Sequence, residues 1–128
     1  MKMKFLCVDI DGEITPICES DYVNDDGINL LSNLLTDDGG VELSDSSEWL
    51  NEGVRIAEQV SDKMVSAADW DRETWGAEIA PDGVKVYSLY DENYCQEFSL
   101  ADFIIILKSW VKFINSELNI DSTYEVVA

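Results

Sequence analysis

The sequence contains no histidine, and its three cysteines stand apart from one another. Cys7, Cys18 and Cys95 form no C-x-x-C pair, and their odd number argues against a disulfide framework. Without histidine, the commonest zinc ligand and the usual catalytic base are both missing. We therefore expect no metal, no cofactor and no enzymatic activity.

Long apolar runs are also missing. The N-terminal run Phe5-Leu6-Cys7-Val8 is too short for a signal peptide, and Asp9 ends it. No stretch approaches the ~20 apolar residues that a membrane-spanning helix needs. We expect a cytoplasmic protein that does not bind membranes.

Basic residues are scarce: eight Lys and Arg stand against 27 Asp and Glu, for a formal net charge of −19. Residues 5–54 carry no basic side chain at all. An apolar fraction of 46% excludes acidic disorder, so the chain folds. Such a surface repels nucleic acid and anionic membranes and attracts basic proteins. A general role in solubility or salt adaptation is the simpler explanation, but halophilic chains seldom combine acidity with so much Ile, Leu and Trp.

Near the N-terminus, two apolar runs flank the dipeptide Asp11-Gly12. Residues 4–9 alternate as a strand does, and residues 13–18 form a second strand-like run. Asp-Gly favours a type I′ turn, because both central residues need positive φ. Pro16 cannot donate a ladder hydrogen bond, which predicts that the second strand of this hairpin lies at a sheet edge.

The same segment, from Val8 to Gly12, resembles the first motif of haloacid-dehalogenase phosphatases. The resemblance implies that Asp9 is a nucleophile and Asp11 an acid. A second strand-like run follows here, where the phosphatase fold forms a short turn and flap before its helix. The acidic pairs at 25–26 and 37–38 also come too early to hold Mg²⁺. A Mg²⁺-dependent phosphatase is therefore the third-ranked hypothesis.

Residues 19–43 are acidic and rich in turn residues. Between the acidic pairs, Ile28, Leu31 and Leu35 recur at helical spacing and predict a short helix. A calcium-binding EF-hand is excluded, because Tyr22 and Leu34 would stand at the first ligand positions. We expect Asp25, Asp26, Asp37 and Asp38 to lie in solvated loops and to affect only the rate of association.

A second helix is predicted to begin at Asp45, an N-cap residue with Glu48 three positions later, and to end near Asp62. Its apolar stripe comprises Trp49, Gly53, Ile56 and Val60. A third helix is capped by Ser99, with Asp102 at the N3 position. The residues of its broad apolar face predict burial: Leu100, Phe103, Leu107, Trp110, Val111, Ile114 and Leu118.

Between these helices, residues 74–79, 84–90 and 94–98 have the pattern of three strands joined by short turns. We expect one α+β domain over residues 1–128. Its sheet is mostly antiparallel, with an N-terminal hairpin and a C-terminal three-stranded meander, packed by two or three helices. Residues 119–128 are expected to be a loose tail.

Aromatic residues are interleaved with acids from Asp69 to Trp75, and Tyr87, Tyr90, Asp91, Glu92 and Tyr94 lie nearby in the sequence. Trp and Tyr are favoured interface anchors, and carboxylates beside them pair with Arg or Lys of a partner. We expect the partner to bind Asp69, Trp70, Asp71, Glu73, Trp75, Tyr87, Tyr90, Asp91, Glu92 and Tyr94. The alternative is that Trp70 and Trp75 are core residues.

Residues 73–115 combine a tyrosine-rich meander with Phe98-Ser99-Leu100-Ala101-Asp102-Phe103 and the helix that follows. This pattern resembles the immunity proteins of bacterial contact-dependent growth inhibition and related polymorphic toxin systems. The resemblance implies tight binding of a cognate toxin, often a basic nuclease, and blockage of its active site. The runner-up hypothesis is an acidic nucleic-acid mimic that inhibits or regulates a DNA- or RNA-binding protein.

Overall fold

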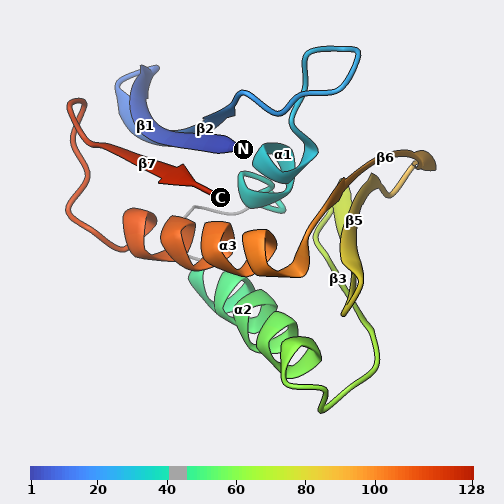
Figure 1. The fold of residues 1–128 in the computed structure, drawn as a ribbon. Coiled ribbons are helices and arrows are strands. Elements are labelled where there is room, and N and C mark those ends of the chain that lie inside the picture. Colours follow the sequence, from blue (N-terminus) through green and yellow to red (C-terminus); the bar gives the residue numbers. More distant parts are fainter. Residues whose placement is uncertain (41–45) are drawn as a thin grey trace.

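The computed structural model describes residues 1–40 and 46–128, which form two antiparallel sheets and three helices. In chain order the elements are β1 (Lys2–Ile10), β2 (Glu13–Ser20), α1 (Leu30–Leu35), α2 (Ser47–Ser61), β3 (Ala68–Asp71), β4 (Trp75–Ala80), β5 (Gly83–Ser88), β6 (Asp91–Phe98), α3 (Leu100–Ile114) and β7 (Thr123–Val127). Helices α1 and α3 lie between the two sheets, and α2 packs against α3 (Figure 1). The expected α+β class is confirmed.

The N-terminal hairpin has the expected turn. Asp11 and Gly12 both have positive φ, 52° and 86°, and β1 and β2 pair from Met3–Ser20 to Ile10–Glu13. The Asp9 carboxylate accepts the Gly12 N–H at 2.8 Å, so this carboxylate stabilises the turn. Pro16 lies in β2, which is an edge strand as predicted.

The C-terminal segment is not a loose tail, and that expectation is wrong. Strand β7 pairs antiparallel with β1, from Lys2–Val127 to Leu6–Thr123. Val126 is only 6% exposed, and the N-terminal amine donates to the carbonyl oxygen of Ala128 at 2.8 Å. This short segment is held by the free edge of β1, which lies more than a hundred residues earlier in the sequence.

The meander contains the three predicted strands, β4, β5 and β6, and one more. Strand β3 pairs with β4 and completes a sheet of order β3-β4-β5-β6. It has four residues, two of them aspartates, so its sequence carries little strand signal. The neighbouring edge of β4 supplies the hydrogen bonds that hold it.

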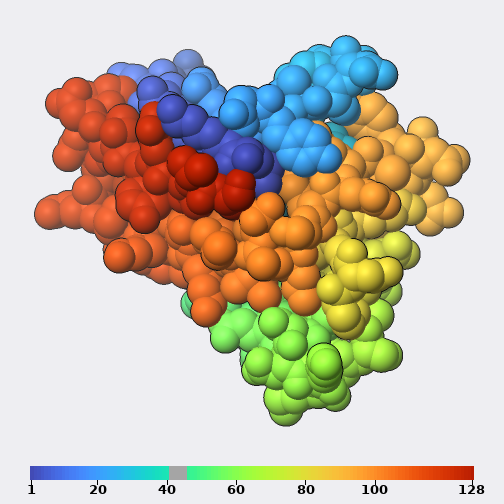
Figure 2. Space-filling model, in the orientation of Figure 1, coloured from blue at the N-terminus to red at the C-terminus, as the bar shows by residue number. Residues whose placement is uncertain are grey.

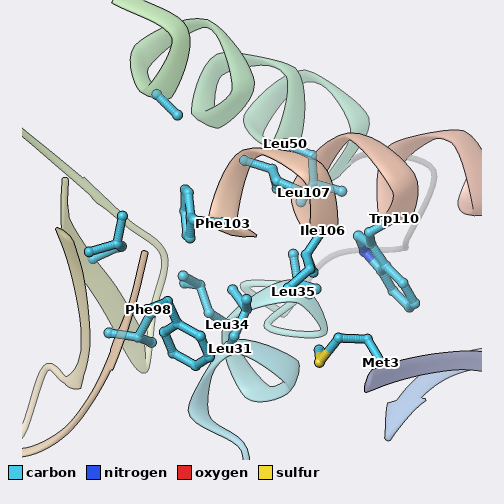
Figure 3. Close-up of a cluster of buried hydrophobic side chains, with 14 of the residues drawn as sticks. Met3, Leu31, Leu34, Leu35, Leu50, Phe98, Phe103, Ile106, Leu107 and Trp110 are labelled. Atoms are coloured by element: carbon cyan, nitrogen blue, oxygen red, sulfur yellow. The ribbon is translucent and has the colours of Figure 1, made fainter. Parts of the chain in front are cut away.

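The core lies between the sheets and is built mainly on α1 and α3. Helix α3 begins as predicted: the Ser99 hydroxyl accepts the Asp102 N–H at 3.1 Å. Leu31, Leu34 and Leu35 of α1 meet the buried face of α3 (Figure 3). The buried residues of α3 are Phe103, Ile106, Leu107, Trp110 and Phe113.

Helix α2 packs through a close contact with β3. The buried residues of this helix are Leu50, Gly53, Ala57 and Val60. The predicted stripe is therefore wrong at two sites, where Leu50 and Ala57 are buried instead of Trp49 and Ile56. A Cβ atom on Gly53 would lie 2.4 Å from the indole of Trp70, which is why a glycine stands in this helix. The N-cap expected at Asp45 falls outside the described residues.

Candidate protein-binding face

The four-stranded sheet presents a row of charged residues on the side away from the helices. Asp69, Glu78, Lys85 and Glu97 are direct neighbours across β3, β4, β5 and β6, so their side chains share one face. The adjacent row on the same face brings Asp71 and Tyr87 together across Gly76. We call this surface the acidic face; it comprises Asp69, Asp71, Glu78, Lys85, Tyr87 and Glu97.

The helices cover only the opposite side of this sheet (Figure 1). On that side Ala77, Ile79, Val84 and Val86 are fully buried, as alternation along the strands requires. All four acids of the acidic face are exposed. The surface is therefore open to a partner and rests on a sheet whose other face is part of the core.

Tyr87 lies among carboxylates of the acidic face, and both its burial and these charges raise its pKa. Burial raises the pKa of the Tyr87 hydroxyl, and the negative charges of Asp69, Glu78, Asp71 and Glu92 raise it further. The Lys85 ammonium lies 5.6 Å from the centre of the Tyr87 ring. Tyr87 is thus a half-buried aromatic side chain surrounded by carboxylates.

The carboxylates of the acidic face form no ion pair within the described residues, where the ion pairs found are Lys2–Glu125, Arg55–Glu52 and Lys108–Glu58. Lys85 lies between Glu78 and Glu97 in the sheet register but is within 4.0 Å of neither. Four acids against one lysine leave the face with a charge of −3. These carboxylates are available to cations of another molecule.

One end of the acidic face is hollowed. An open depression of about 680 Å³ is lined by Glu78, Asp82, Lys85 and Glu97 together with Tyr22 and other residues. The Tyr22 hydroxyl donates to the carbonyl oxygen of Glu97 at 2.9 Å and fixes this rim. The depression has the polarity to take a cationic side chain such as arginine.

Of the residues predicted from sequence, Asp69, Asp71 and Tyr87 lie on the acidic face, with Glu92 close to it. Tyr90 and Asp91 lie at the β5–β6 turn, where Tyr90 is 80% exposed. Glu73 is exposed in the β3–β4 turn. These seven residues are accessible to a partner.

The other three predicted residues serve the fold. Trp70 is 4% exposed, stacks on Trp49 with ring centres 4.2 Å apart, and donates to the Trp49 carbonyl. Trp75 and Tyr94 lie on the helix side of the sheet, with ring centres 6.3 Å apart. The Tyr94 hydroxyl donates to Asp26 at 2.9 Å. Of these three, Trp70 is a core residue, so its assignment as an anchor is corrected.

Sequence reasoning missed Glu78, Lys85 and Glu97. The signal that would have found them is the two-residue period of the strands, combined with the register that aligns them with Asp69. That register depends on β3, which was not predicted.

Two loop acids have structural partners, contrary to expectation. One carboxylate oxygen of Asp37 accepts the N–H groups of Glu73, Thr74 and Trp75, at 3.3, 2.9 and 3.1 Å. Asp26 accepts from Tyr94, as described above. Both carboxylates hold loops against the four-stranded sheet, so changing them alters the fold as well as the charge.

The described residues include no group of three or more His, Cys, Asp or Glu side chains arranged to hold a metal ion. The Cys18 thiol is half-buried, and this burial raises its pKa to about 11. The hydrogen bond that Ser32 donates to the sulfur opposes the rise, and the negative charge of Glu19 adds to it. A thiol with this pKa is protonated near neutral pH and is a poor nucleophile.

No protein-family model, curated protein or solved structure matches this chain. Among the described residues, no helix is both long enough and apolar enough to cross a membrane.

Proposed function

We propose that the acidic face binds a basic protein and inhibits it, in the manner of an immunity protein that neutralises a nuclease toxin. The observation that carries this proposal is a set of four exposed carboxylates on one face of a sheet, around Tyr87. Within residues 1–40 and 46–128 these carboxylates form no ion pair. The resemblance to immunity proteins concerns residues 73–115, which form β4, β5, β6 and α3.

A nuclease is a fitting target because it must present Lys and Arg to the phosphates of its substrate. Carboxylates match those side chains in charge and, for Arg, in bidentate geometry. A protein that covers the cationic surface excludes the nucleic acid from it. The inhibitor needs no turnover and no group that reacts.

The acidic face is a better binding surface than the acidic loops, because it lies on strands. Binding to an ordered sheet avoids the entropic cost of ordering a loop. Tyr87 and the exposed Tyr90 supply aromatic surface that loses little side-chain entropy on binding. The loop carboxylates Asp26 and Asp37 already accept hydrogen bonds within the protein.

The test uses two double charge reversals. Asp69→Lys with Glu78→Lys changes neighbours on the acidic face, and Glu117→Lys with Asp121→Lys changes exposed acids elsewhere. Each substitution of an acid by lysine changes the net charge by +2, so both double variants have a net charge of −15 instead of −19. They lose the same net charge but differ in whether the acidic face is changed.

The proposal predicts that a gene for a cationic nuclease adjoins the gene for this protein. Binding to that nuclease and inhibition of its activity are measured, with cell survival as a second readout. We expect the face variant to lose about 2–5 kcal/mol of binding free energy and to stop protecting cells, because buried charge pairs turn repulsive. The control variant should bind more slowly and still protect. Equal effects from both variants would mean that only net charge matters, and would remove the acidic face from the proposal.

The charge also predicts a salt dependence. Association should slow markedly between about 50 and 500 mM NaCl, because salt screens the attraction between exposed charges. Stopped-flow mixing measures the rate directly. A rate that does not change with salt would exclude electrostatic steering.

A further inference from the structure

The outer side of the three-stranded sheet carries an apolar surface that remains partly exposed in the described chain. Along β1, Met3, Phe5 and Cys7 point into the core, so Leu6, Val8 and Ile10 point outward. Ile17 of β2 pairs directly with Leu6 and lies on the same side. We call this surface the hairpin face; it comprises Leu6, Val8, Ile10, Thr15 and Ile17.

The helices lie on the other side of this sheet. There Phe5 meets Trp110 of α3 with ring centres 5.1 Å apart. The aliphatic residues on the outer side are absent from the hydrophobic core and from the side chains packed against it. Leu6, Val8 and Ile17 are partly exposed, and Ile10 is 49% exposed. An antiparallel sheet with one solvated face normally places polar residues there. Four aliphatic residues together on that face therefore indicate that another surface covers them.

The charge on this side of the sheet differs from that of the rest of the protein. Its charged residues are Lys2, Lys4, Glu13, Glu19 and Glu125, two positive against three negative, for a sum of −1. Lys4 lies directly between Glu19 and Glu125 in the sheet, and the Lys2 ammonium lies 3.6 Å from Glu125. These charges largely neutralise one another.

This balance bears on what covers the hairpin face. A basic partner gains little attraction from a surface of charge −1, and it has the acidic face with its charge of −3 available on the other sheet. A second copy of this acidic chain meets least repulsion where its own charges cancel. The occupant that fits both the apolar side chains and the charge is the same surface of a second molecule.

We propose that two copies of this chain pair through their hairpin faces about a two-fold axis. A two-fold contact uses the same patch on both molecules, and apolar sheet faces pack against each other at about 10 Å. The three-stranded and four-stranded sheets lie on opposite sides of the molecule (Figure 2). The dimer therefore leaves both acidic faces free, and its formation does not depend on the proposed function.

The net charge gives this dimer a distinctive salt dependence. Two chains of −19 repel each other outside the contact, and added salt screens that repulsion. Salt should therefore strengthen the dimer, whereas it weakens binding to a basic partner. The opposite signs allow the two interactions to be separated in one set of buffers.

Sedimentation equilibrium of the purified protein at about 50 and 500 mM NaCl tests the proposal. The variant Val8→Lys with Ile17→Lys changes the hairpin face. The matched control, Ile105→Lys with Ile120→Lys, places the same charge at two isoleucines that are 47% and 51% exposed elsewhere. A third variant, Val8→Thr with Ile17→Thr, keeps β-branched residues and adds no charge, and circular dichroism verifies that each variant folds.

We expect the wild type and the control to dimerise more tightly at high salt. Both hairpin-face variants should dimerise at least about tenfold more weakly, although the lysine variant is less negative and repels itself less. A wild type that stays monomeric at high salt and high concentration would overturn the proposal. Hairpin-face variants that fold and dimerise as the wild type does would also overturn it. A third refuting result is a monomeric wild type whose hairpin-face variants lose only the binding of a basic nuclease.

Discussion

Replacing Asp37 by alanine tests how a loop carboxylate holds the four-stranded sheet. Asp37 follows α1, and its carboxylate accepts three N–H groups from the β3–β4 turn, 36 to 38 residues later in the sequence. Its second oxygen accepts the Gly39 N–H at 3.2 Å. The substitution therefore removes the acceptor that orients the turn between β3 and β4.

The size of the effect follows from these contacts. A hydrogen bond to a charged group contributes about 1.5–3 kcal/mol net, and leaving a buried N–H without an acceptor adds to the loss. Three bonds share one oxygen, and the Glu73 N–H is near solvent, so water replaces part of what is lost. We expect Asp37→Ala to lower the free energy of unfolding by about 2–4 kcal/mol.

Urea unfolding followed by tryptophan fluorescence measures this free energy, since Trp70 and Trp75 flank the turn. The matched control is Asp38→Ala, because within the described residues the Asp38 carboxylate accepts only the Gly40 N–H. The control should lose less than about 1 kcal/mol. If both variants lose the same amount, the three hydrogen bonds of Asp37 do not stabilise the fold as argued.

Three further outcomes follow from contacts described above. Gly53→Ala should destabilise the fold by about 1–3 kcal/mol in thermal unfolding, because the added Cβ meets Trp70, although alanine favours helix. The control Asn51→Ala, on the exposed side of α2, should be neutral or stabilising. Gly12→Val should lower the free energy of unfolding by about 1–2 kcal/mol, because the φ of this residue is 86°. Asp9→Asn keeps an acceptor for the Gly12 N–H and should be as stable as the wild type. The opposite ranking would contradict the role assigned to Gly12 in the turn. Tyr87 has a raised pKa in the folded state, so stability should fall as pH rises above about 10 through that pKa; Tyr87→Phe should lack this loss, and an unchanged pH dependence would show that Tyr87 is not its source.

The elements whose signals are local can be derived from the amino-acid sequence alone. Asp11-Gly12 predicted the hairpin turn because positive φ at two successive residues is a property of those residues. Ser99 and the apolar spacing after it predict α3, because helix capping and helical periodicity are also local properties of the sequence. The acidic and aromatic composition of residues 69–94 was likewise enough to bring Asp69, Asp71 and Tyr87 into the candidate site.

The pairing of the strands, and the side chains that share a face, follow from contacts in the folded protein and not from local patterns. Strands β3 and β7 are short and weakly patterned, and the edges of β4 and β1 hold them in place. The two-residue period of a strand assigns a side chain to a face only after the register with its neighbour is known. That register places Glu78 beside Asp69 and Glu97 in the same row beyond Lys85, and it leaves Trp70 on the buried side of β3. It depends on contacts between distant parts of the chain, which no local pattern contains.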